Sequence, residues 1–156
     1  MGKELIQNRK GQKIVSIIKR TENQKGLVFV IHGLGGFKEQ PHIQTMAEAF
    51  KDKEYTVITF DATNSLGESD GNIGEATLTN YYEDLEDVID WSKNQKWYQE
   101  PFCLAGHSLG GICSILFAQK YPEKIKALAP ISTVVSGQLR LEANRKENEQ
   151  WKREGF

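Results

Sequence analysis

Short apolar runs that alternate with segments of helical periodicity constrain this chain more than any other feature of its sequence. The runs are rich in β-branched and aromatic residues, as buried strands are, and they cover residues 27–31, 55–60, 101–105 and 125–131. Strands that alternate with helices predict parallel βαβ units with right-handed crossovers. The sequence therefore predicts an α/β fold in which a mostly parallel sheet carries helices on both faces.

The segments between the runs carry apolar residues at helical spacing. The first set follows Pro41 and the second follows a Gly/Ser/Asp/Asn-rich loop at 61–75; they are Ile43, Met46, Ala47 and Phe50, then Leu78, Tyr81, Tyr82, Leu85, Val88 and Ile89. A third segment, which begins near Ile112, is apolar nearly all round and predicts a helix that packs centrally. Polarity alternates on both sides of residues 9–12, which predicts an N-terminal antiparallel hairpin.

The bulk composition gives no sign of a nucleic-acid or membrane partner. The 156 residues suffice for one domain, and 20 Lys and Arg against 21 Asp and Glu leave a net charge of -1. The N-terminus has no apolar export signal, and the longest apolar runs are far too short to cross a bilayer. Cys103 and Cys113 lie in apolar segments, where reduced and buried thiols are expected. We predict a cytoplasmic protein with no nucleic-acid or membrane partner.

The composition changes after Gly137, where charged residues become dominant. The pattern predicts a solvated helix or a lid arm. Two i, i+4 pairs would each support such a helix by about 0.2–0.5 kcal/mol: Glu142 with Lys146 and Glu149 with Arg153. We divide the chain into residues 1–136, the core, and residues 137–156, the start of a lid or cap segment.

The segment Gly106-His107-Ser108-Leu109-Gly110 joins the third apolar run to the apolar helix that follows it. A Gly-x-Ser-x-Gly segment between a strand and a helix forces a sharp turn, in which glycine fits at the flanking positions and the serine is lifted above the sheet edge. A Gly/Ser-rich turn can match this pattern by chance, but the preceding strand and the following helix are the context that a nucleophile requires. We predict that Ser108 is a catalytic nucleophile.

A glycine-rich turn, His32-Gly33-Leu34-Gly35-Gly36, follows the first apolar run. Such a turn can direct a backbone N–H at the carbonyl oxygen under attack, and Leu34 is the predicted donor. The second predicted donor is the N–H of Leu109, immediately after the nucleophile. A dinucleotide-binding loop would need glycine at Lys38 or Gln40, and a P-loop would need Gly-Lys-Ser/Thr, so both alternatives fail.

Together these segments resemble the α/β-hydrolase superfamily, in particular its esterase, cinnamoyl-esterase-like and serine-aminopeptidase-like members. The resemblance spans almost the whole chain and rests on ordered landmarks: the His32-Gly33 turn, Phe60-Asp61 before Gly67-Glu68-Ser69-Asp70-Gly71, the elbow with Gly111, and Ala129-Pro130. It implies the N-terminal part of that fold, with the C-terminal strands missing. At Thr63-Asn64-Ser65 many relatives have Arg-Gly and are one residue shorter; Asn64 can supply the left-handed conformation there.

A serine nucleophile also needs a histidine base and an orienting carboxylate, in the chain order Ser, acid, His in this fold. No histidine follows Ser108. We interpret His107 as a packing residue, because neighbouring side chains diverge at an elbow. His32 is interpreted as a turn-stabilising residue, and His42 begins a surface helix.

Nothing in the sequence implies a metal or a cofactor. The two cysteines and three histidines share no Cys-x-x-Cys or His-Glu-x-x-His arrangement. Asp61 and Asp70 precede the serine and are interpreted as loop-ordering residues. The triad acid and base are therefore expected outside residues 1–156, in a truncated, partial or split protein.

Two functions are open at this point. The first is a serine hydrolase that cleaves carboxylic esters of small or medium acyl groups through an acyl-serine intermediate, with the 156-residue chain inactive by itself. The second is a non-catalytic partner-binding module, or an inactive fragment, in which the elbow is only a turn. In either case the strand at 125–131 is an edge, which predicts pairing in a homodimer or with a complementing C-terminal fragment.

Overall fold

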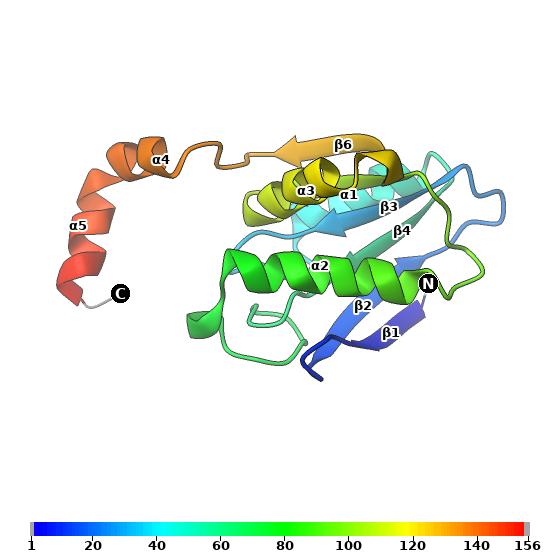
Figure 1. The fold of residues 1–156 in the computed structure, drawn as a ribbon, viewed down its shortest axis with the longest axis horizontal. Coiled ribbons are helices and arrows are strands. Elements are labelled where there is room, and N and C mark those ends of the chain that lie inside the picture. Colours follow the sequence, from blue (N-terminus) through cyan, green and yellow to red (C-terminus); the bar gives the residue numbers. More distant parts are fainter. Residues whose placement is uncertain (1, 155–156) are drawn as a thin grey trace.

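The computed structural model describes residues 2–154, without the side chains of Glu147 and Trp151, and shows a six-stranded sheet (Figure 1). The strands are β1 (Gly2–Gln7), β2 (Lys13–Lys19), β3 (Gly26–Ile31), β4 (Tyr55–Phe60), β5 (Phe102–His107) and β6 (Ile125–Ile131). Their order is β1-β2-β4-β3-β5-β6. β1, β2 and β4 pair antiparallel, whereas β4, β3, β5 and β6 run parallel. The predicted α/β fold, mostly parallel sheet and N-terminal hairpin are confirmed.

Helices cover both faces of the sheet, as predicted. They are α1 (Pro41–Lys51), α2 (Leu78–Ser92) and α3 (Leu109–Lys120), with short 3-10 turns η1 (Ile73–Glu75) and η2 (Pro122–Lys124). Because side chains of a strand alternate between faces, Val28 and Val30 of β3 pack with α1, whereas Phe29 and Ile31 pack with α2 and α3. Both faces of β3 are therefore buried, which explains its uninterrupted apolar sequence.

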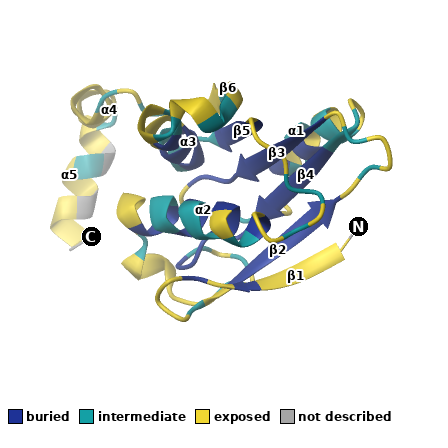
Figure 2. Ribbon diagram, turned by 45° about the vertical axis from the view of Figure 1, so that its right-hand side comes forward, coloured by how far each residue is buried: buried dark blue, intermediate teal, exposed yellow. Residues whose placement is uncertain are grey.

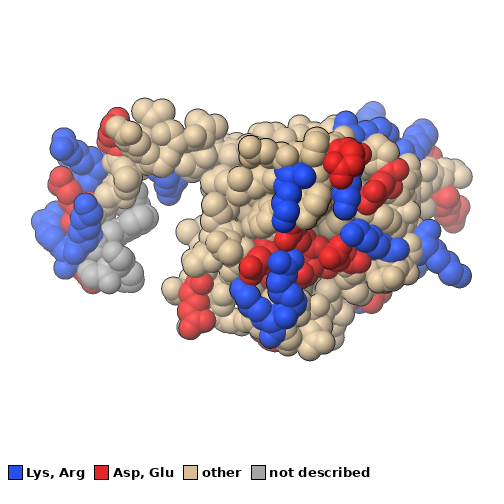
Figure 3. Space-filling view, in the orientation of Figure 1, with Lys and Arg blue, Asp and Glu red and all other residues tan. Residues whose placement is uncertain are grey.

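α2 is amphipathic and separates the core from a charged surface. Thr77 caps its N-terminus by accepting a hydrogen bond from Asn80 N at 3.1 Å. The outer side of α2 pairs with cations of other elements: Arg9 with Glu86 and Asp87, Lys10 with Glu83, and Lys120 with Glu86. Figure 3 shows carboxylates gathered over α2 with cations around them, so the negative charge of this helix is balanced by neighbouring Lys and Arg.

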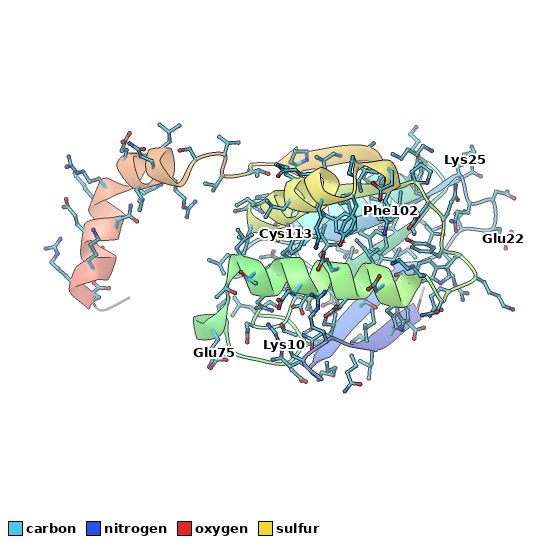
Figure 4. All side chains as sticks on the ribbon, in the orientation of Figure 1. Lys10, Glu22, Lys25, Glu75, Phe102 and Cys113 are labelled. Carbon is cyan, nitrogen blue, oxygen red and sulfur yellow. The ribbon has the colours of Figure 1, made fainter. Side chains whose placement is uncertain are left out.

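α3 does not pack centrally among the described residues, and that prediction is wrong for this part of the protein. Its inner side is buried at Cys113 and Phe117, which belong to the core between α2, α3 and the sheet. Figure 4 shows Cys113 between α3 and α2. Ile115 and Leu116 on the outer side are each 36% exposed, because no element of residues 2–154 covers them (Figure 2). Cys103 and Cys113 are both unpaired and buried, as predicted.

The segment after Ser136 forms an arm of two helices, α4 (Gly137–Ala143) and α5 (Arg145–Glu154), which extends away from the sheet (Figure 1). We call these two helices the arm. Asn144, with φ -112° and ψ 32°, interrupts the single helix that the charge pattern suggested. The break places Glu142 and Lys146 on different helices, and the ion pair found among described arm residues is instead Arg145–Glu149 at 3.9 Å. The second predicted pair is also wrong, since Arg153 Nε donates to the backbone oxygen of Glu149 at 3.2 Å.

The predicted boundary at residue 137 coincides with the first residue of α4, and residues 155–156 lie outside the described part of the chain. Nothing in the arm tests its predicted role as a lid. Within residues 2–154, no helix has both the length and the apolar character that crossing a bilayer requires.

Candidate active site

The site lies where the chain changes direction across the sheet. β3 is flanked by β4, which follows it through α1, and by β5, which the chain reaches later through α2. Ligands of open α/β sheets bind beyond the carboxyl ends of strands at such a switch point. Ile31 of β3 pairs with Gly106 of β5, so the glycine-rich turn after β3 and the elbow after β5 are neighbours.

Ser108 forms a strained elbow between β5 and α3. Its φ of 50° and ψ of -114° are rare for a residue with a side chain, as a nucleophile elbow requires. A Cβ at Gly106 would lie 2.3 Å from the oxygen of Gly110, and one at Gly110 would lie 2.4 Å from the oxygen of Ile31. Ser108 N also donates to Ile131 O at 2.9 Å, which ties the elbow to the end of β6. The glycines on either side of Ser108 are thus sterically required.

The turn after β3 lies directly beside Ser108. A Cβ at Gly33 would be 3.1 Å from Ser108 Cβ, a tight contact that glycine avoids. Gly36 N donates to Gly33 O at 3.0 Å, and Gly35 takes a φ of 66° to complete the turn. Within residues 2–154 the backbone N–H groups of Leu34 and Leu109 donate no hydrogen bond. The structure places the first of these amides in the turn and the second immediately after Ser108.

The buried His32 side chain holds the turn in place through two hydrogen bonds. Its Nε2 accepts a hydrogen bond from Ala62 N at 3.1 Å, so Nδ1 carries the proton and donates to Gly33 O at 2.8 Å. Burial lowers the pKa of His32, which keeps the ring neutral. With both nitrogens engaged, His32 stabilises the turn and is not a base, in agreement with the sequence interpretation.

His107 and His42 contact each other beside the turn. Their ring centroids are 4.5 Å apart in an edge-to-face arrangement. Burial lowers the pKa of His107, and the nearby His42 lowers it further. The contact supports the interpretation of His107 as a packing residue; it joins α1 to the elbow, which the sequence did not reveal.

The loop after β4 is ordered by carboxylates, as predicted for Asp61 and Asp70. Asp61 accepts from the backbone N–H of Lys38 at 2.6 Å and of Glu68 at 2.8 Å. Asp70 accepts from Lys13 N at 2.8 Å, which joins the loop to β2. Asn64 has the left-handed φ of 59° that the sequence comparison suggested.

Two buried charged residues near the site were not found by sequence reasoning. Lys38 is fully buried against Asp61, and Asp84 of α2 is 1% exposed. Asp84 accepts from Thr63 N at 2.6 Å, Thr63 Oγ1 at 2.7 Å and Asn8 Nδ2 at 2.9 Å. Burial raises the pKa of Asp84, and these hydrogen bonds oppose the shift. These buried residues cannot be predicted from residue spacing, because their hydrogen-bond partners come from distant segments of the sequence.

No group of three or more His, Cys, Asp and Glu side chains among the described residues is arranged to hold a metal ion. One hollow of about 590 Å³ lies along the arm, lined by Leu141, Glu142, Arg145, Asn148, Glu149 and Lys152. It is an open surface between charged side chains and does not include Ser108. We therefore take the switch point, and not this hollow, as the candidate active site.

Comparison with known proteins agrees with this geometry. The sequence profile described as serine aminopeptidase, S33, matches residues 22–153. The mitochondrial palmitoyl-protein thioesterase ABHD10 of Mus musculus is 30% identical over 115 residues, which are 72% of this chain and 35% of that protein. The cis-3-alkyl-4-alkyloxetan-2-one decarboxylase of Shewanella oneidensis is 29% identical over 127 residues, 81% of this chain and 37% of that protein.

Solved structures share the fold. Est1E from Butyrivibrio proteoclasticus, solved with bound ferulic acid, has a TM-score of 0.77 and 28% identity over 83% of this chain and 52% of its own. Mouse ABHD10 has a TM-score of 0.71 at 22% identity over 100% of this chain and 65% of its own. The chain spans about a third of the length of the curated relatives and about half of Est1E. With its profile matched over residues 22–153, this chain belongs to the serine aminopeptidase, S33, family of α/β-hydrolases.

Proposed function

We propose that this chain carries the nucleophile of a serine hydrolase that cleaves carboxylic esters of small or medium acyl groups. The observation that supports the proposal most strongly is the conformation of Ser108, whose φ of 50° is held at the switch point beside a glycine-rich turn. A turn that only connected β5 to α3 would gain nothing from this strain. Strained backbone concentrates where function needs it.

In the proposed reaction, Ser108 Oγ forms a bond to the acyl carbon of the ester while a base takes its proton. The carbonyl oxygen becomes an oxyanion, which accepts hydrogen bonds from the N–H groups of Leu34 and Leu109. The bond to the alcohol oxygen then breaks, and the alcohol leaves with the proton held by the base. Water attacks the acyl-serine in the same way and releases the acid.

The base and the acid of the triad are proposed to come from residues outside this chain. His32 has both nitrogens engaged, and no histidine follows Ser108. The 156-residue chain by itself is therefore expected to hydrolyse p-nitrophenyl acetate several orders of magnitude more slowly than the full-length protein. A rate typical of esterases from the isolated chain would assign a base to His107 or His42.

Labelling with a fluorophosphonate tests the nucleophile, since this reagent reacts with an activated serine hydroxyl. The full-length protein should label, and Ser108→Ala should abolish both labelling and ester hydrolysis. Ser132→Ala is the matched control, because Ser132 shares the φ of 50° but follows β6 instead of the elbow strand. If Ser108→Ala labels and hydrolyses like the wild type, the non-catalytic, partner-binding interpretation replaces this proposal.

The substrate class is tested by comparing matched oxygen esters and thioesters of increasing acyl length. A relative named palmitoyl-protein thioesterase makes the thioester series the necessary comparison. We propose a preference for short and medium oxygen esters; a higher kcat/KM for long-chain thioesters would contradict it. That relative's name also places it in mitochondria, so a cytoplasmic location stays a prediction.

A further inference from the structure

Lys38 is a buried lysine at the end of the turn that carries Leu34. Its side chain is 0% exposed, and its ammonium group donates to Asp61 at 2.7 Å and to Glu68 at 2.6 Å. Burial opposes the charge, but the hydrogen bonds to Asp61 and Glu68 outweigh it and raise the pKa of Lys38. The lysine is therefore charged in the folded protein, and Asp61 is the carboxylate buried with it.

Lys38 binds Asp61 through its main chain as well as its side chain. The Lys38 N–H donates to Oδ1 at 2.6 Å, and Nζ donates to Oδ2 at 2.7 Å. Two hydrogen bonds from one residue to the two oxygens of one carboxylate fix orientation as well as distance. The carboxylate has little room to move, because a Cβ at Gly67 would lie 2.1 Å from its carbon.

The other end of the turn, at His32, is bonded to Ala62, the residue after Asp61. His32 Nε2 accepts from Ala62 N at 3.1 Å, next to Asp61 in the chain. Between these two anchors the turn has one further bond to the loop, from Leu66 N to Gly36 O at 3.3 Å. Leu34 thus lies on a short span whose ends are fixed to consecutive residues at the end of β4.

We propose that the Lys38–Asp61 ion pair positions the Leu34 N–H for the oxyanion, which makes Lys38 a positioning residue of the reaction proposed above. An oxyanion donor lowers the barrier only where it is held in place before the charge develops. A displacement of about 1 Å can cost on the order of a hundredfold in rate. Loss of the ammonium group would leave this end of the span held to Asp61 by the Lys38 N–H alone. The carboxylate would lose its second fixed oxygen, which should weaken the contact with the transition state more than substrate binding.

The test uses the full-length protein with the variants Lys38→Met and Asp84→Asn. Lys38→Met keeps the backbone N–H and the length of the side chain but removes the ammonium group. Asp84→Asn is the matched control, because Asp84 is an equally buried carboxyl that holds Thr63 and does not contact the turn. For each folded variant, kcat and KM for p-nitrophenyl acetate and Ki for a trifluoromethyl ketone are measured. The ketone forms a tetrahedral adduct whose oxygen needs the same donors.

Lys38→Met should lower kcat at least tenfold, leave KM within about threefold, and raise Ki by the factor by which kcat falls. Asp84→Asn should keep kcat within about twofold while lowering the melting temperature. A folded Lys38→Met with wild-type kcat, or an equal loss in Asp84→Asn, overturns the inference.

If Lys38→Met does not fold, the double variant Lys38→Met/Asp61→Asn, which removes both buried charges, is judged by the same criteria. If that variant also fails to fold, the pair is a stabilising element of the fold, and its assignment as a positioning device is overturned. Ser108→Ala separates the two proposals. Retained activity in Ser108→Ala overturns the proposed function and this inference together, whereas lost activity there with an unaffected Lys38→Met overturns this inference alone.

Discussion

The two sides of Ser108 differ in how they are held. On one side, residues 32–38 and 61–71 are joined by buried hydrogen bonds through His32, Lys38 and Asp61; we call this the braced side. On the other, Ser108 N donates to Ile131 O where β6 ends, and residues 131–144 are mostly exposed (Figure 2); we call this the open side.

Under the proposed function, the braced side holds the Leu34 donor to the oxyanion, and the open side leads into the segment predicted to be a lid. Donors to a developing charge must be preorganised, and buried polar networks supply that rigidity. Segments with few buried contacts open at low free energy, which suits a lid. We therefore expect substitutions on the braced side to cost far more stability than comparable ones on the open side.

A pair of glycine substitutions gives the largest expected contrast. Gly110→Ala, where α3 contacts the braced side, should lower the free energy of unfolding by about 3 kcal/mol, because the new Cβ would lie 2.4 Å and 2.5 Å from the backbone oxygens of Ile31 and His32. Gly137→Ala on the open side should change it by less than about 0.5 kcal/mol, since nothing lies within 4 Å. Urea unfolding followed by circular dichroism measures both. Similar costs at the two positions would remove the distinction between the sides.

His32, on the braced side, should make the stability of the protein depend on pH. Burial is the main cause of its lowered pKa, and Lys38 and His42 lower it further, against Gly33 O and Asp61, which raise it. As the pH drops below 6.5, the ordinary pKa of histidine, His32 is protonated in the unfolded state but stays neutral in the folded state. The free energy of unfolding therefore falls.

His32→Gln removes the titratable group and should be less stable than the wild type at pH 7.5. The difference in unfolding free energy between the two proteins should narrow as the pH is lowered to 5, by at most about 1.4 kcal/mol per pH unit. His42→Gln serves as the control, because His42 is exposed. A gap between His32→Gln and the wild type that is independent of pH would show that His32 does not titrate on unfolding.

Much of the fold, and less of the site, could be predicted from the sequence. β3, α2 and the elbow could be predicted because the pattern of residues that identifies each of them lies within its own short segment of sequence. Buried polar partners are not local: Lys38 and Asp61, on the braced side, are 23 residues apart, and Asn8 and Asp84, outside it, are 76 apart. Whether a charged residue is buried cannot be predicted from its own segment, because burial depends on a partner elsewhere in the sequence. For α3 the local sequence is apolar on all sides, so it does not predict which side the rest of the protein covers.

The two edges of the sheet offer a test of intermediate size. β6, which leads into the open side, exposes Leu128 at 37% and Ile131 at 43%, beside backbone groups that pair with no strand among residues 2–154. Such an edge recruits another strand, whereas lysine on an edge prevents this. Light scattering during size-exclusion chromatography should give a mass for the 156-residue chain that rises with concentration. Leu128→Lys should shift it toward the monomer, and Leu5→Lys on the β1 edge should not. A sharp, concentration-independent monomer would contradict this prediction.

The smallest effect is expected in the arm, where Arg145 and Glu149 pair at 3.9 Å with side chains 84% and 61% exposed. An exposed pair of this kind stabilises a helix by about 0.2–0.5 kcal/mol, because water and salt screen it. Glu149→Gln should therefore accelerate amide hydrogen exchange in α5 by about twofold at low salt, and the difference should disappear in 1 M NaCl. The urea midpoint of the core should not move, since α4 and α5 contact each other and extend away from the sheet. A shifted midpoint would mean that the arm contributes to the stability of the core, and the open side would then be braced in a way that its contacts do not show.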